Sequence, residues 1–148
     1  MENLSNGQLA ALGVSLGVFF IVAIIIWVLE VIAGWKIFKK AGEPGWKSII
    51  PIYSSYISYK IAWNSMMFWV TFAIGIVYNL LAKGESGFMT IAAGVIMIVN
   101  IVIYCMYNGK MAKAFGKGTG FAVGLVFLNP IFKLILGFGN ARYQGPQA

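Results

Sequence analysis

Few side chains in this sequence could do chemistry. There is no histidine and no aspartate among the 148 residues, and the four glutamates lie in separate segments: Glu2, Glu30, Glu43 and Glu85. An imidazole base or ligand is therefore excluded, and a catalytic carboxylate pair would need two glutamates that the sequence keeps apart. Cys105 is the single cysteine, so we expect it to be a small residue of an apolar helix. The sequence predicts no enzymatic activity, no metal site and no cofactor.

A glycine-rich run at residues 116–120 could in principle cradle a phosphate. A phosphate-binding loop would follow a strand and carry the pattern GxxxxGK[ST], whereas this run follows a predicted helix and lacks the pattern. We therefore interpret it as a turn whose glycines continue a ridge of small residues into the next helix. The glycines predicted to pack helices together are Gly13, Gly17, Gly116, Gly120 and Gly124.

Four polar residues stand inside apolar segments: Glu30, Asn100, Asn129 and Lys133. Ionisable groups in such segments can mark transport routes, and near the membrane surface they can also serve as anchors. Glu30 is expected to reach the headgroups or pair with a lysine, and the alternative is an ion or proton site. Lys133 is expected near the outer surface as an anchor, and the alternative is a residue that lines a transport route. Asn129-Pro130 should kink its helix.

Membrane helices must position these residues. Hydrophobic residues make up 60% of the chain, charged residues 10%, and the mean hydropathy is +0.84, whereas soluble domains carry about 25% charged residues. The composition predicts an all-α integral membrane protein with a single membrane domain over residues 1–148. Apolar stretches of about 20 residues predict four transmembrane helices, over 9–33, 66–82, 88–107 and 121–138. The third should continue through 108–115, and a short interfacial or re-entrant helix is expected over 50–63.

The longest polar interruption, residues 34–47, forms a cationic elbow. It holds four lysines and ends in a Gly-Glu-Pro-Gly turn. Lysines beside apolar helices bind anionic lipid headgroups, and aromatic residues favour the membrane interface. The predicted headgroup contacts are Lys36, Lys39, Lys40, Lys47, Lys110, Lys113 and Lys117. The predicted interface aromatics are Trp35, Trp46, Tyr53, Tyr56 and Trp63. The net charge of +7 therefore indicates anionic lipid as the partner rather than nucleic acid.

The distribution of positive charge predicts an orientation. With four crossings, eight lysines fall on one side of the membrane, and Lys83 and Arg142 fall on the other. The positive-inside rule makes the lysine-rich side cytoplasmic. We expect a multi-pass protein of the bacterial cytoplasmic (inner) membrane with both termini extracytoplasmic. The N-terminal segment lacks the basic residues of a signal peptide, so the first helix should be retained.

Two blocks of the sequence resemble an uncharacterised family of small bacterial polytopic membrane proteins. They are GWKIFKKAGEPGWKSIIPIY at residues 34–53 and AKAFGKGTGF at residues 112–121. The resemblance implies the membrane architecture and no particular activity. Members are sometimes labelled signal peptidase I, which resembles a serine-lysine dyad enzyme. However, Ser65 and Lys83 bracket one predicted helix and would stand about 27 Å apart, far beyond the distance for proton transfer.

Two functions from different classes follow from these residues. The first is a non-enzymatic membrane component that packs against itself or another membrane protein and binds anionic lipid through its lysine-rich loop. The second is an oligomeric small channel or carrier with a polar route between its helices. A membrane peptidase is a remote third. The expected partners are a bilayer with anionic lipids and either further copies of the chain or another membrane protein.

Overall fold

The computed structural model describes residues 5–147, and this part of the chain contains helices and turns but no strand. The all-α expectation is confirmed for these residues. The elements, in order, are α1 (Asn6–Lys40), the 3-10 helix η1 (Gly45–Ser48), α2 (Pro51–Ala62), α3 (Ser65–Ala82), α4 (Gly87–Ala114), α5 (Thr119–Phe127) and α6 (Asn129–Phe138). Glu2 and the start of the N-terminal segment lie outside the described residues.

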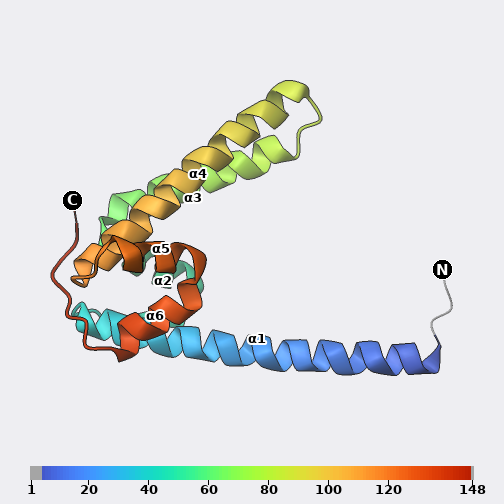
Figure 1. Cartoon of the computed structure of the whole chain (residues 1–148). Helices are drawn as coiled ribbons and strands as arrows, with labels where there is room; N and C mark the ends of the chain where they lie inside the picture. Colours follow the sequence, from blue (N-terminus) through green and yellow to red (C-terminus); the bar gives the residue numbers. More distant parts are fainter. Residues whose placement is uncertain (1–4, 148) are drawn as a thin grey trace.

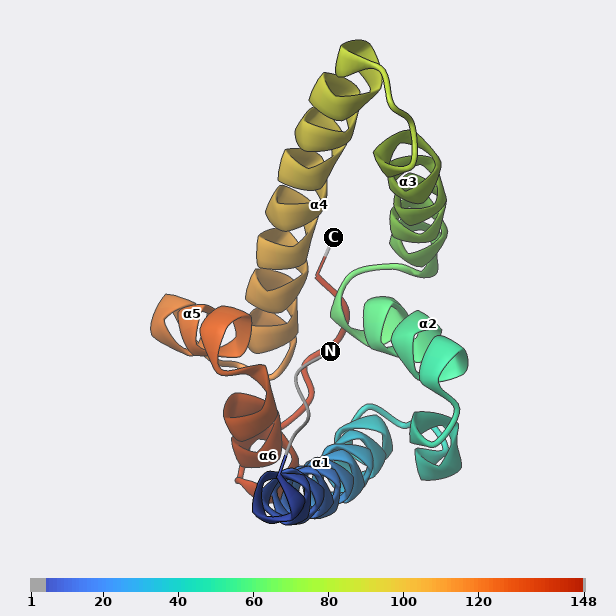
Figure 2. The ribbon, with the colours of Figure 1, turned by 90° about the vertical axis from the view of Figure 1, so that its right-hand side faces the viewer.

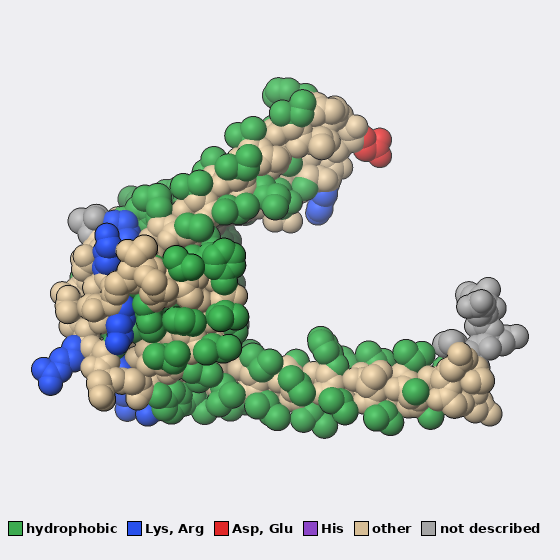
Figure 3. Space-filling view, viewed as in Figure 1, with side chains coloured by type: hydrophobic (Ala, Val, Ile, Leu, Met, Phe, Trp, Pro, Cys, Tyr) green, Lys and Arg blue, Asp and Glu red, His purple; other side chains and the backbone are tan. Residues whose placement is uncertain are grey.

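Three helices, α1, α3 and α4, are long and apolar enough to cross a membrane. The first runs alone along one side of the molecule, and the other two form a hairpin that diverges from it (Figure 1). Residues 6–29 of α1 are exposed throughout. A hollow separates this part of α1 from the hairpin (Figure 3). We call residues 6–29 and the hairpin the two arms.

The fourth apolar segment does not form one continuous helix. It divides at Leu128 into α5 and α6, which have 9 and 10 residues and are each about 14 Å long, well short of the about 30 Å hydrocarbon core. Pro130 lacks the N–H of a continuing helix. Beside it, the Asn129 side chain donates to the Leu125 carbonyl at 3.1 Å. The chain reverses here and returns to α1, so the expected crossing over 121–138 is corrected to a folded-back pair of short helices (Figure 1).

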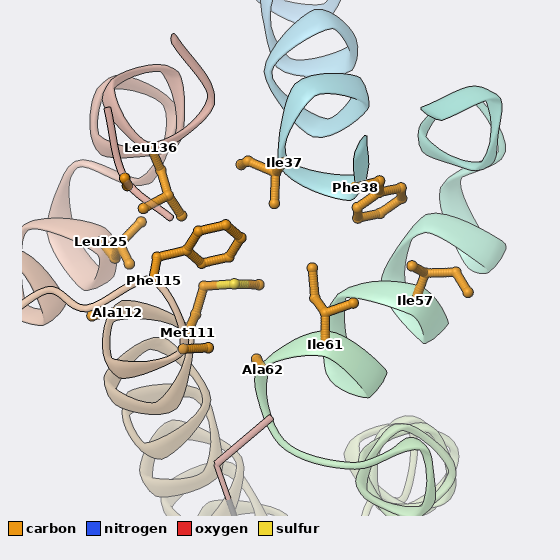
Figure 4. Packing of buried hydrophobic residues seen from close by; sticks show 12 residues of the cluster. Ile37, Phe38, Ile57, Ile61, Ala62, Met111, Ala112, Phe115, Leu125 and Leu136 are labelled. Carbon is orange, nitrogen blue, oxygen red and sulfur yellow. The ribbon is translucent and has the colours of Figure 1, made fainter. Parts of the chain in front are cut away.

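Beyond the arms the helices form a ring. α1 contacts η1 and α6, α6 contacts α5, α5 contacts α4, α4 contacts α2, and α2 contacts η1. Viewed along α1, α5 and α6 lie on one side of the ring and α2 lies on the other (Figure 2). Large apolar side chains from all sides fill its centre (Figure 4). The buried cluster includes Ile37, Phe38, Ile57, Ile61, Met111, Phe115, Leu125 and Leu136.

The cationic elbow is shorter than the sequence suggested. α1 continues as a helix to Lys40, and a turn over residues 41–44 leads into η1. The helix persists because Ala33, Gly34, Ile37 and Phe38 are buried in the ring, so tertiary packing supports the stretch that polarity alone marked as a loop.

The C-terminal segment, residues 139–147, lies at the same end of the molecule as the lysines. The Tyr143 hydroxyl donates to the Ile61 carbonyl at 2.7 Å, and the Gln147 backbone N–H donates to the Ala62 carbonyl at 3.0 Å. The start of α1 lies at the opposite end (Figure 1). This separation differs from the expectation that both termini share one side of the membrane, which was based on four crossings. We call the end that carries the ring the cationic end.

The glycines predicted to form a packing ridge have different roles. Gly116 has a φ of +70° and ends α4, in a backbone conformation that suits glycine. Gly124 alone meets a facing helix, because a Cβ there would clash with the Phe132 ring of α6. No atom lies within 4 Å of a Cβ built at Gly13, Gly17 or Gly120 in the described chain.

The closest helix crossing in the ring is at a glycine that the sequence did not single out. A Cβ at Gly137 of α6 would lie 2.9 Å from the Ala33 carbonyl oxygen and 3.1 Å from the Ala33 Cα of α1.

We expect Gly137→Val to destabilise the protein by about 1–3 kcal/mol through overpacking, measured as a lower midpoint of thermal unfolding in detergent. Gly17→Val is the matched control, because its site is open. Equal midpoints for the two variants would contradict the crossing.

Candidate functional site

A polar cavity of about 260 Å³ lies inside the ring. Five helices line it: α1, α2, α4, α5 and α6. Its polar lining residues are Ser54, Ser55, Ser58, Tyr59, Tyr104, Tyr107, Asn108, Asn129 and Lys133. We call this cavity the polar chamber. Three of these residues, Ser54, Ser55 and Ser58, come from α2.

Two asparagines from different helices meet in the polar chamber. Asn108 is 1% exposed, and its side-chain amide donates to the Tyr104 carbonyl at 2.9 Å. Its oxygen accepts from the Asn129 amide at 3.5 Å. Asn129 was predicted as an intramembrane polar residue, whereas Asn108 was overlooked because it stood beside lysines in a stretch expected to leave the membrane.

An ion pair stands at the edge of the polar chamber. The Lys133 ammonium of α6 lies 3.1 Å from a Glu30 carboxylate oxygen of α1, and the two side chains are 31% and 28% exposed. The sequence suggested a lysine partner for Glu30, but from the nearby elbow rather than from α6. Lys133 was expected near the outer surface as an anchor, and in the structure its ammonium pairs with Glu30.

The lengths of the apolar helices indicate the depth of the polar chamber. A hydrocarbon core about 30 Å thick is crossed by about 20 helical residues. Counting about 20 residues from Leu9 along α1 reaches Leu29, and counting from Phe88 along α4 reaches Asn108. A membrane span that begins at Leu9 or at Phe88 would therefore end close to Glu30 on α1 and close to Asn108 on α4.

Asn100, the remaining polar residue of the apolar segments, lies apart from this site. It is about two turns from Asn108 along α4 and lines a cavity of about 410 Å³ together with Thr71 and Tyr78. This cavity shares Tyr59 and Tyr104 with the polar chamber. The four intramembrane polar residues therefore do not form one cluster.

Several lysines that were predicted to contact headgroups make hydrogen bonds or ring contacts within the protein. The Lys40 ammonium donates to the carbonyls of Leu136 and Gly139, each at 2.7 Å, and so caps α6. Lys110 donates to the Gln147 carbonyl at 3.1 Å and lies 4.7 Å from the Trp63 ring centroid. Lys36 and Lys117 lie 4.4 Å and 5.7 Å from the ring centroids of Phe138 and Phe121, respectively.

Exposed cations nevertheless gather at the cationic end (Figure 3). We define the cationic rim as Lys36, Lys39, Lys113 and Arg142, whose residues are exposed. Arg142 was assigned to the other side of the membrane, and its position beside the lysines strengthens the charge asymmetry. Lys83, at the tip of the hairpin, is the single cation at the opposite end of the described chain.

Glu43 connects the turn after α1 to η1 and α2. Its two carboxylate oxygens accept from Lys47 at 2.7 Å and from Lys60 at 2.5 Å. These hydrogen bonds hold the pKa of Glu43 below its ordinary value. Lys47 therefore orders the chain here, although it was predicted to contact lipid.

The aromatic residues predicted at the membrane interface make ring contacts between neighbouring helices. Ring centroids are 6.1 Å apart for Trp46 and Tyr53 and 6.2 Å apart for Tyr53 and Tyr56. Tyr56 meets Phe68 of α3 edge to face at 5.6 Å. Trp35 lies over Gly45, where a Cβ would clash with the indole ring. This aromatic row links η1, α2 and α3.

Ser65 and Lys83 stand at the two ends of α3: the serine begins the helix and the lysine is its C-cap. The helix has 18 residues and is therefore about 27 Å long. The two side chains cannot act as a catalytic dyad within one molecule.

Residues 46–146 match a family described as a family of unknown function, DUF5684. The chain belongs to the DUF5684 family. The matched region begins in η1 and includes Asn108, Asn129 and Lys133 but not Glu30. No curated protein and no solved structure matches this DUF5684 chain. The match agrees with the expected uncharacterised family, and the function must be argued from the geometry of the chain itself.

The Glu43 network predicts a pH dependence. The folded pKa of Glu43 lies below the ordinary value of 4.5, so the network stabilises the fold above about pH 4.5 and this stabilisation is lost as the pH falls through the lower folded pKa. We expect the unfolding midpoint to fall less on acidification in Glu43→Gln than in the wild type, measured by tryptophan fluorescence in detergent. Glu85→Gln, at the hairpin tip, should behave like the wild type. An unchanged acid response in Glu43→Gln would exclude this role.

Proposed function

We propose that this DUF5684 protein is a non-enzymatic, multi-pass component of the bacterial cytoplasmic membrane that binds anionic lipid through its cationic rim. The observation that carries the proposal is the clustering of exposed cations at the end of the molecule that holds the ring. Each lysine or arginine near an anionic membrane surface contributes about 1 kcal/mol of attraction. The four side chains of the rim together therefore favour a negatively charged leaflet.

The same asymmetry supports a cytoplasmic position for the cationic end, since positive charge is retained on that side. The start of α1 and the hairpin tip with Lys83 and Glu85 are then extracytoplasmic, and the C-terminal segment is cytoplasmic. This orientation uses three crossings by α1, α3 and α4, while α5 and α6 enter from the cytoplasmic side and return. The exposed apolar residues at their junction, Phe127, Leu128 and Ile131, suit contact with lipid chains.

The arms support a role in assembly. Residues 6–29 of α1 are exposed in the described chain, and they include Gly13 and Gly17, which have open space around them. Small residues of this kind allow a helix from another membrane protein, or from a second copy, to approach closely. Binding of a protein partner through α1 is therefore the second part of the proposal.

A small channel or carrier is the alternative, and the polar chamber is the observation that favours it. The chamber brings Asn129 and Lys133 together with three serines of α2. We call the side of the chamber nearest the cationic end its floor. Core residues such as Ile37, Met111 and Leu136 form this floor and separate the chamber from the cationic end. A transport route would have to open through this packed core, so the geometry favours a binding role over conduction.

Removal of rim charge should lower the retention of anionic lipid. We expect the triple variant Lys36→Gln, Lys39→Gln and Lys113→Gln to lose most bound phosphatidylglycerol in native mass spectrometry, because about 3 kcal/mol of attraction is removed. These lysines are exposed, whereas Lys40 caps α6 and is left unchanged. Lys83→Gln, at the opposite end, is the control. Equal retention by the triple variant and the wild type would refute lipid binding by the rim.

The orientation can be tested with single cysteines in a Cys105→Ala background. Glu85→Cys should react with an impermeant thiol reagent added to intact spheroplasts, and Arg142→Cys should react only after the membrane is opened. Denatured samples provide the control for thiol reactivity. Labelling of Arg142→Cys in intact spheroplasts would place the C-terminal segment outside and overturn the three-crossing arrangement.

A further inference from the structure

We propose that the polar chamber binds the headgroup of a phospholipid that carries both a phosphate and a primary ammonium, with an acyl chain lying along α3. This inference requires that α1, α3 and α4 cross the membrane, and it does not depend on lipid binding by the cationic rim. It assigns to the chamber a ligand class different from that of the rim.

The closed floor of the polar chamber determines where a ligand can enter. Ile37, Met111 and Leu136 line the chamber and also belong to the buried cluster. Each of them lies closer to the cationic end than the polar residue on the same helix. Ile37 lies beyond Glu30 on α1, Met111 beyond Asn108 on α4, and Leu136 beyond Lys133 on α6. The C-terminal segment covers this end further, through bonds to Ile61 and Ala62. The polar lining therefore faces the hollow between the arms, which is the side of the hydrocarbon, so the ligand enters from the bilayer.

A groove continues from the polar chamber along α3. Ser55 and Tyr59 line the chamber and also a second cavity of about 590 Å³, whose apolar wall includes Phe68, Phe72, Ile76 and Leu80. From Phe68 to Leu80 the helix rises about 18 Å. The groove therefore runs away from the headgroup level in the direction that an acyl chain of the same leaflet takes.

Apart from Lys83, which lines the groove at the hairpin tip, the polar groups of this groove are bonded within the protein. The Thr71 hydroxyl lies 2.8 Å from the Met67 carbonyl and 3.3 Å from the Tyr59 hydroxyl. The Asn79 amide donates to the Gly75 carbonyl at 2.8 Å. Because these groups have partners, an apolar chain can cover them with less loss of hydrogen bonding.

The charges at the polar chamber favour a zwitterion. Lys133 lines the polar chamber and pairs at 3.1 Å with Glu30, which lies beside the chamber and is not one of its lining residues. The other polar lining residues carry hydroxyls and amides. A purely anionic headgroup would meet Lys133 but would be repelled by Glu30. A phosphate beside Lys133 and an ammonium beside Glu30 satisfy both. A primary ammonium also donates hydrogen bonds to serine, tyrosine and asparagine oxygens, which a quaternary ammonium cannot do.

The volume of the polar chamber fits such a headgroup. At about 30 Å³ per water, its 260 Å³ holds about nine water-sized groups. This is close to the number of non-hydrogen atoms in a phosphoethanolamine unit. The remainder of the lipid would lie in the groove and the hollow.

The test compares lipid retention by the full chain purified in mild detergent and exposed to equal amounts of phosphatidylethanolamine, phosphatidylcholine and phosphatidylglycerol. Native mass spectrometry should show preferential retention of phosphatidylethanolamine over phosphatidylcholine, whereas bound phosphatidylglycerol reports on the cationic rim. Glu30→Gln and Lys133→Met should each reduce phosphatidylethanolamine retention about tenfold or more, because each removes a charged hydrogen-bond partner. The rim variant Lys39→Gln is the matched control and should leave phosphatidylethanolamine retention unchanged.

A second variant separates loss of binding from loss of folding. Ser58→Leu fills the polar chamber without changing its charges, and it should lower phosphatidylethanolamine retention while the unfolding midpoint stays near that of the wild type. Equal retention of phosphatidylethanolamine and phosphatidylcholine by the wild type, or undiminished phosphatidylethanolamine retention by both Ser58→Leu and Lys133→Met, would overturn the proposal. Displacement of the lipid by equimolar glycerophosphoethanolamine would also overturn it, because the acyl chain would then contribute nothing.

Discussion

The ring of helices depends on the interruption of the last apolar segment at Leu128. Pro130, the second residue of α6, lacks a backbone donor, and polar backbone in hydrocarbon must find partners within the protein. Asn129 supplies one by donating to the Leu125 carbonyl, and Phe132 begins the next helix by donating to the Leu128 carbonyl at 3.1 Å. Because these backbone carbonyls have hydrogen-bond partners, the chain can reverse direction here instead of continuing across the membrane.

The reversal determines where charge is placed. It directs α6 toward the cationic end, where its last carbonyls would remain without partners, and Lys40 donates to two of them. It also brings Lys133 beside Glu30 and places Arg142 among the lysines. The lysines that the sequence predicted as lipid-headgroup contacts therefore fall into two groups with different roles. Some cap and connect helices, and the cationic rim remains available to the membrane surface.

Local signals in the sequence were sufficient to locate most helices. Pro51 and Asn64 mark the starts of α2 and α3, and hydropathy marks the long helices, because these signals act within a few residues. The direction taken after Pro130 was not predictable, since a proline kink and a reversal have the same local pattern. The Glu30–Lys133 pair joins residues 103 positions apart.

The last third of α1 belongs to the same structural unit as the DUF5684 region, although the family match begins at residue 46. Without residues 30–40, Lys133 would have no carboxylate at 3.1 Å, the α6 carbonyls would lose their Lys40 cap, and Gly137 would have no facing helix. An unpaired, half-buried ammonium and uncapped carbonyls are both unfavourable in a membrane setting. The polar chamber therefore exists only where α1 closes the ring, and the exposed outer arm of α1 extends from a segment that the packing already holds in place.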